Sequence, residues 1–240
     1  MKKTYVLFLC VVAYNICSFG QVQHAGWLAA FYTFKLNNKI SIHNDVQWRS
    51  SDELKHTQSF LFRLGINVAV NKTVVTSGGY AWIRNRRTTG NVAGYAPEHR
   101  IWEQLVVNHK TGRLLTAHRF RLEQRFISKT IVENNNLKTD GSFFASRFRY
   151  FLRNILPVRK SEKFEKGCFI ALQNELFFNI GDNSNLNNAV FDQNRFYLAV
   201  GYRLNRQFDL EAGYLNQYIR GRDRAFSNIH IAQLAGYVRL

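Results

Sequence analysis

Histidines and serines are the first residues in this 240-residue chain that suggest chemistry. A hydrolytic site needs a nucleophile within hydrogen-bond reach of a general base. His118 and Ser146 both fall on apolar faces of neighbouring segments, but pairing through residues 128–142 sets Ser146 near Glu123 and several residues away from His118. The sequence therefore predicts no catalytic site, and we expect that the protein is not an enzyme.

Metal and cofactor sites have no support in the sequence either. The histidines are dispersed, and we find no HExxH spacing, no paired cysteines and no glycine loop that could cradle a phosphate. We expect neither a metal nor a cofactor. The histidines are His24, His43, His56, His99, His109, His118 and His230.

The chemistry that remains is a set of arginines and carboxylates that alternate with apolar residues and so share the polar face of their segments. If this face is enclosed, the charges either fill the interior and knit the strands together, or line an anion-favouring lumen through the excess of arginine. The expected lumenal charge network comprises Glu98, Arg100, Arg119, Arg121, Glu123, Arg125, Arg147, Arg149, Arg153, Glu175, Arg195, Arg203, Asp209 and Glu211.

A predicted β-hairpin between Pro97 and Phe126 must position the centre of this network. Its two arms alternate with period two on either side of Thr111 and Gly112, which we take as a two-residue loop. Opposite charges then meet across the strands without further adjustment. The facing pairs in this register are Glu98 with Arg125, Arg100 with Glu123, and Trp102 with Arg121.

The same alternation recurs along the chain in about eleven runs of roughly 10 to 14 residues, lengths that suit tilted membrane strands. Short turns are expected at residues 37–38, 71–72, 111–112 and 205–207. Longer loops are expected at residues 49–56, 85–98, 128–142, 181–192 and 221–228. Short turns at one rim and longer loops at the other indicate an all-β, antiparallel transmembrane β-barrel of about 10–12 strands.

Two features do not fit this prediction. Eleven is an odd number, whereas single-chain bacterial barrels have even strand counts, so either a strand is missed or split, or the N-terminal strand is unusual. If the C-terminus is periplasmic and the rims alternate strictly, the first strand begins at the outer rim. In addition, Glu103 shares the apolar face of the central hairpin, where a carboxylate facing lipid is costly.

The start of the chain has the features of a secretory signal peptide. Lys2 and Lys3 precede a short apolar run that ends in small residues near Gly20. We therefore expect residues 1–20 to be removed and residues 21–240 to form an outer-membrane barrel domain. Removal also takes two of the three cysteines, and leaves Cys168, at the start of an apolar strand, as an expected small buried side chain.

The charge of the chain bears on its partners. The formal net charge of +17 falls to +15 once Lys2 and Lys3 are removed, which argues for an anionic partner or surface. We expect contacts with outer-membrane lipid and lipopolysaccharide, contact with the barrel-assembly machinery during insertion, and no nucleic acid. The sequence does not indicate an oligomeric state.

Several motifs together resemble a known family. The chain is similar to the exported β-barrel family of Gram-negative bacteria that is labelled only as a domain of unknown function. The resemblance covers most of the mature chain, implies an outer-membrane barrel, and brings no activity and no catalytic residues. It rests on Glu98–Gln104, His118–Phe126, Arg147–Tyr150, Asn174–Glu175, Phe191–Arg195, Gly201–Tyr202 and Leu210–Tyr214.

The favoured interpretation is a cell outer-membrane barrel that is porin-like, serving as a structural barrel or as a narrow anion-preferring pore. One alternative is a lipid-modifying outer-membrane barrel enzyme. Another is a soluble periplasmic β-barrel that binds an apolar ligand inside, in which case the polar and apolar faces exchange roles.

Overall fold

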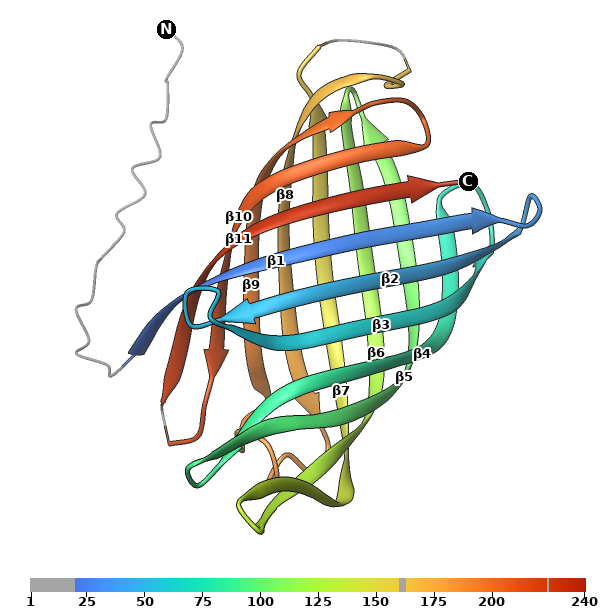
Figure 1. Ribbon diagram of the computed structural model, residues 1–240. Coiled ribbons are helices and arrows are strands. Elements are labelled where there is room, and N and C mark those ends of the chain that lie inside the picture. Colours follow the sequence, from blue (N-terminus) through green and yellow to red (C-terminus); the bar gives the residue numbers. More distant parts are fainter. Residues whose placement is uncertain (1–19, 160–162, 224) are drawn as a thin grey trace, which may run out of the picture.

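The computed structural model describes residues 20–159, 163–223 and 225–240, and places eleven strands in one closed barrel (Figure 1). The strands are β1 (Gly20–Lys35), β2 (Ile40–Ser51), β3 (His56–Ala69), β4 (Val74–Thr89), β5 (Val92–Thr111), β6 (Leu114–Glu133), β7 (Asn136–Pro157), β8 (Gly167–Ile180), β9 (Phe191–Arg203), β10 (Phe208–Arg220) and β11 (Phe226–Arg239). The predicted all-β barrel of about 10–12 strands is confirmed. The described residues include no helix that is long and apolar enough to cross a membrane. Residues 1–19 of the predicted signal peptide lie outside the described residues.

The odd strand number is accommodated by a parallel pair. Ten consecutive antiparallel pairings leave β1 and β11 running in the same direction, and these two strands close the barrel side by side (Figure 1). Leu28 lies opposite Leu234, and Ala30 lies opposite Gly236. The eleven runs predicted from the sequence are therefore eleven strands, and β1 begins at the rim opposite to the one where the chain ends.

Side chains alternate between the two faces of the wall along most of each strand, because successive residues of a strand point to opposite sides, and the register shifts only near Ser50, Ser128 and Phe178 in the described strands. In β9, Leu198 and Val200 are 48% and 64% exposed on the outer face, whereas Tyr197 and Ala199 are buried inside. Large apolar side chains cover the outer face of most strands in the same way. The interior holds many of the arginines together with aromatic rings and a buried apolar cluster around Trp27, Phe169 and Tyr197.

The rim where the chain ends carries short turns of a common design. Asn37, Asn71 and Asn205 each accept hydrogen bonds through Oδ1 from the backbone N–H groups two and three residues later, at 2.8–3.0 Å. Asparagine favours such turns because its side chain replaces a backbone acceptor. We call this end of the barrel the Asn-turn rim, and the opposite end the hairpin rim.

At the hairpin rim two of the predicted loops are strand instead. β4 and β5 continue to a two-residue loop at Gly90 and Asn91, and β6 and β7 continue to one at Asn134 and Asn135. The two hairpins project beyond the barrel wall (Figure 1). The prediction of loops at residues 85–98 and 128–142 was wrong because polar and apolar residues fall on both faces there, which removes the hydrophobic alternation while the backbone pairing continues.

The central hairpin has a different register from the predicted one. The loop consists of Gly112 and Arg113, and Gly112 takes a φ of 59° at the first loop position, as a type II′ turn requires. All pairings are therefore displaced by two residues, so that Arg100 lies opposite Arg125 and not opposite Glu123. An even displacement keeps every side chain on its predicted face, and only the partners change.

Glycines make room for the largest side chain inside the barrel. Trp102 is 1% exposed and packs over Gly65, where an added Cβ would lie 2.6 Å from the ring atom Cη2 and 2.8 Å from the carbonyl oxygen of Gly78. We expect Gly65→Ala to lower the free energy of unfolding by about 1–3 kcal/mol, as overpacking does. Chemical denaturation measures the change.

Gly236→Ala is the matched control for this substitution. Its added Cβ would point outward, with Cδ2 of Leu210 as the nearest atom at 3.9 Å. If the two variants unfold at the same denaturant concentration, the space that Gly65 leaves for the Trp102 ring does not contribute to stability.

Candidate functional site in the barrel lumen

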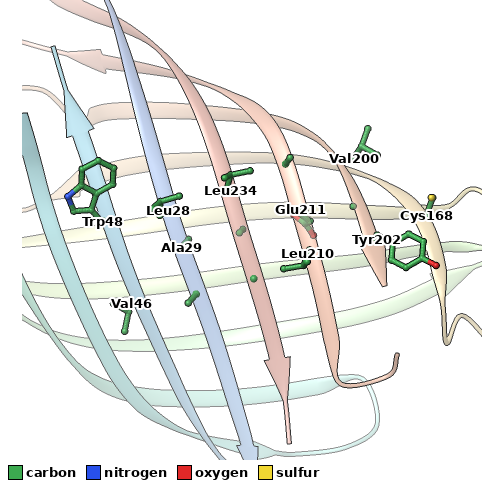
Figure 2. A pocket seen from close by; sticks show the side chains of 15 residues that line it. Leu28, Ala29, Val46, Trp48, Cys168, Val200, Tyr202, Leu210, Glu211 and Leu234 are labelled. Carbon is green, nitrogen blue, oxygen red and sulfur yellow. The ribbon is translucent and has the colours of Figure 1, made fainter. Parts of the chain in front are cut away.

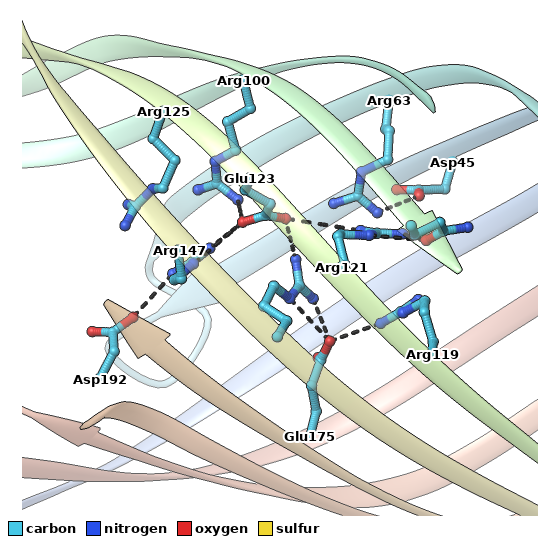
Figure 3. A network of polar contacts seen from close by, with 12 residues as sticks. Asp45, Arg63, Arg100, Arg119, Arg121, Glu123, Arg125, Arg147, Glu175 and Asp192 are labelled. Atoms are coloured by element: carbon cyan, nitrogen blue, oxygen red, sulfur yellow. Dashed lines mark hydrogen bonds and ion pairs between the residues drawn. The ribbon is translucent and has the colours of Figure 1, made fainter. Parts of the chain in front are cut away.

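Glu123 lies at the centre of the charges that fill the lumen (Figure 3). This β6 side chain is 1% exposed. Arg147 donates to its Oε2 at 2.8 Å, Arg149 donates to its Oε1 at 2.5 Å, and Arg100 lies 3.5 Å from Oε2. One carboxylate therefore joins three strands, β5, β6 and β7, through charge-assisted hydrogen bonds.

Two further carboxylates extend the network around the wall. Glu98 in β5 accepts hydrogen bonds from the Nε atoms of Arg100 and Arg125, both at 2.7 Å. Glu175 in β8 accepts from Arg149 at 2.6 Å and from Arg119 at 2.7 Å. Because Arg149 contacts both Glu123 and Glu175, the network runs continuously from β5 to β8.

Four more of the predicted charges, Arg153, Arg203, Asp209 and Glu211, lie nearer to the Asn-turn rim. Arg153 in β7 pairs with Glu211 in β10, two strands that are not neighbours, so this pair crosses the lumen. Arg203 makes two hydrogen bonds to Asp209 across the β9–β10 turn, at 2.8 and 2.9 Å, as the predicted register of that turn requires. The fourteen predicted residues are thus all on the inner face, but they form several groups.

The network also includes residues that the sequence analysis did not assign to it: Asp45 in β2, Arg63 in β3, Gln104 in β5 and Asp192 in β9. Asp45 is 1% exposed and accepts a hydrogen bond from Arg63 at 2.7 Å. Asp192 accepts from Arg147 at 3.0 Å, and Gln104 accepts two hydrogen bonds from Arg121. Alternation with apolar neighbours is the signal that could have found Asp45 and Arg63.

Two arginines have aromatic partners in place of carboxylates. Arg49 and Arg195 both lie over the ring of Trp27, at 4.3 and 5.0 Å from its centroid, and Arg195 also lies 4.8 Å from that of Phe177. Their acceptors are the side-chain oxygens of glutamines in their own strands. In the part of the chain that the structure describes, no ion pair links either arginine to a carboxylate.

Among the described residues, two cavities in the lumen share side chains, one toward each rim, and a third of about 400 Å³ lies beside β1, β2 and β11. The cavity toward the hairpin rim measures about 250 Å³, and the cavity toward the Asn-turn rim measures about 290 Å³. Four side chains contribute to the lining of both cavities, namely Arg49, Arg63, Arg149 and Arg195. The two cavities therefore meet at a cluster of four guanidinium groups, which we call the arginine junction.

A large hollow lies on the outer face, over β1, β2 and β9–β11 (Figure 2). Small residues such as Ala30, Ala212 and Gly236 form its floor, and it measures about 670 Å³. Cys168 lies at its edge and is exposed, which corrects the expectation of a buried thiol. Glu211, whose backbone reaches this hollow, is buried on the other side of the wall.

The residues that first suggested catalysis do not form a site. The Nδ1 atom of His118 contacts Tyr150 Oη at 2.9 Å, whereas Ser146 lies opposite Gln124, six positions along β6 and so roughly 20 Å away. Among the described residues, no group of three histidine, cysteine or carboxylate side chains could hold a metal ion.

Glu103 is exposed on the outer face, as the alternation predicts. It accepts a hydrogen bond from Gln124 Nε2 at 3.0 Å on the neighbouring strand. The partner amide therefore satisfies one carboxylate oxygen on an otherwise apolar surface.

Comparison with known proteins places the chain in a family. Residues 24–228 match the family model described as "Protein of unknown function (DUF2490)". An uncharacterized protein of Methylorubrum extorquens is 26% identical over 235 residues, which covers 96% of this chain and 95% of that protein. The predicted membership of a family labelled only as a domain of unknown function is thereby confirmed, and the chain belongs to the DUF2490 family.

Proposed function

We propose that this protein is an outer-membrane β-barrel that provides a narrow passage preferring anions. Membrane insertion is supported by the outer face, where apolar side chains such as Phe144, Leu198 and Leu234 are 48–57% exposed. Soluble monomers rarely expose continuous apolar surfaces of this extent, whereas hydrocarbon solvates them. Every strand of the closed barrel pairs with a neighbour on both edges. The backbone N–H and C=O groups are therefore hydrogen-bonded within the barrel wall, as the hydrocarbon core of a bilayer requires.

The arginine junction is the observation that supports anion passage. Two cavities reach it from opposite rims, and Arg49 and Arg195 have no carboxylate partner there within the described residues. Rings of cationic side chains favour anions in pores. A network that served only to fill the barrel would balance its charges more closely, and it would not need a cavity on each side.

The orientation follows from barrels of this class, in which short turns face the periplasm and longer loops face outward. The Asn-turn rim and the C-terminus then lie on the periplasmic side, and the projecting hairpins lie on the cell surface. The expected partners are outer-membrane lipid, lipopolysaccharide, and the assembly machinery during insertion.

Planar bilayer recordings of the purified protein test the passage. We expect small, steady currents whose reversal potential in a potassium chloride gradient shows preference for chloride. A protein that inserts without conducting would be a structural barrel, and cation preference would contradict the role of the arginine junction. Fractionation of cells tests insertion itself, since recovery in the soluble periplasm would exclude a membrane barrel.

A further inference from the structure

We propose that the cavity toward the hairpin rim, here called the arginine vestibule, binds a soluble, multiply charged phosphorylated compound. This inference deepens the proposed function, because it names the class of anion that the lumen receives. It rests on the lumen being the functional site, but binding does not require that the anion passes through.

The charge balance of the vestibule is the first observation. Nine arginines and a single glutamate line it. That glutamate, Glu98, already accepts hydrogen bonds from Arg100 and Arg125. Three inward-facing arginines of the lining have no ion pair to a carboxylate of the described chain, namely Arg49, Arg87 and Arg195, whereas Arg86 lies opposite Tyr95 and so shares the outward face of Arg84. A chloride ion cannot balance this charge, whereas a compound with several negative charges can.

Unpartnered donors are the second observation. The Nε atoms of Arg49, Arg63 and Arg195 are buried and have no hydrogen-bond partner in the structure. Arg63 is itself 4% exposed. Buried N–H groups without acceptors are costly, so the vestibule is set up to receive acceptor oxygens. The planar fork of arginine matches phosphate oxygens two at a time.

The guanidinium groups are held in place before any anion arrives. Arg49 and Arg195 stack on Trp27, and Arg63 is held by its 2.7 Å hydrogen bond to Asp45. Preorganised donors lose less entropy when the ligand binds. Arg87, on the projecting part of β4, is exposed and lines the mouth of the same cavity.

The position and volume of the vestibule favour a free phosphorylated compound over a phosphate carried by a lipid. The vestibule lies inside the wall and measures about 250 Å³, so lipid-borne phosphates outside the barrel do not reach it. A free compound, such as inorganic phosphate, pyrophosphate or a small phosphate ester, fits this position.

Isothermal titration of the detergent-solubilised protein with pyrophosphate, phosphate or chloride at constant ionic strength tests the proposal. We expect saturable binding of pyrophosphate, weaker binding of phosphate and no saturable binding of chloride. Arg49→Gln combined with Arg195→Gln should weaken pyrophosphate binding by about tenfold or more. Arg84→Gln is the matched control, since Arg84 lies on the same strand as Arg87 but over the ring of Tyr95, outside the vestibule. It should bind pyrophosphate like the unsubstituted protein.

The exposed Arg87→Gln variant provides a second test if the double variant does not fold, and we expect it to bind pyrophosphate several-fold more weakly. Absence of saturable pyrophosphate binding to the unsubstituted protein, or equal binding by the vestibule variants, would overturn the site. Binding without conductance would leave the site in place and refute the passage. Conductance without pyrophosphate binding would refute the site alone.

Discussion

Glu123→Gln is expected to lower the free energy of unfolding by about 3–5 kcal/mol, the cost of removing one partner from a buried ion pair. The substitution keeps the shape of the side chain but leaves Arg100, Arg147 and Arg149 without the carboxylate that they share. Arg121, whose Nη1 lies 3.9 Å from Glu123, loses the same charge. The temperature at which the folded band is lost on a gel, together with denaturant unfolding, measures the effect.

Glu103→Gln on the neighbouring strand provides the control for Glu123→Gln. Its carboxylate is exposed on the outer face and accepts one hydrogen bond, from Gln124. We expect it to change stability far less. Equal losses in the two variants would mean that Glu123 does not hold the lumenal network together.

The second large effect is on ion selectivity. Arg49→Glu combined with Arg195→Glu changes the charge at the arginine junction by four elementary units, and no existing ion pair is broken because neither arginine has a carboxylate partner in the described chain. We expect the reversal potential in a potassium chloride gradient to change sign, from chloride to potassium preference.

Arg206→Glu is the comparison variant for selectivity. Arg206 lies in the exposed β9–β10 turn at the Asn-turn rim and pairs with Glu165, so reversing its charge acts only on a solvated pair. Its reversal potential should keep the original sign. If the double variant also keeps that sign, ions do not pass the arginine junction.

Period-two alternation was sufficient to predict the barrel and the face of each side chain. Phe120, Leu198 and Val200 are exposed outside, and Arg121 and Arg149 are enclosed. Alternation fixes the face because it depends only on local backbone geometry. The same signal fails in the projecting hairpins, where both faces are exposed and each carries polar and apolar residues, such as Ile131 and Val132 beside Lys129 and Glu133.

Partners are harder to predict than faces. Straight-across charge matching predicts a register for the central hairpin that differs by two residues from the observed one. In the structure the predicted partners still meet, but diagonally: Arg125 reaches Glu98 at 2.7 Å, and Arg121 lies over the ring of Trp102. Long arginine side chains bridge such offsets, so charge pairing alone does not determine register.

Contacts across the lumen are not visible in the sequence at all. Arg153 meets Glu211 from a strand that is not its neighbour, and Arg49 in β2 and Arg195 in β9 share the ring of Trp27 in β1. Which inner side chains face each other depends on how the barrel closes, and here the parallel pairing of β1 with β11 sets that closure. A list of strands does not contain this information.

Spin labels along β9 test most directly the central claim that the outer face contacts hydrocarbon. In protein carrying Cys168→Ser and reconstituted in lipid vesicles, single cysteines replace Phe196, Leu198 or Val200, which point outward. Labels at these sites should collide with oxygen dissolved in the bilayer and be shielded from a water-soluble nickel reagent. Labels that collide with the nickel reagent at all three positions would contradict a membrane-facing outer wall.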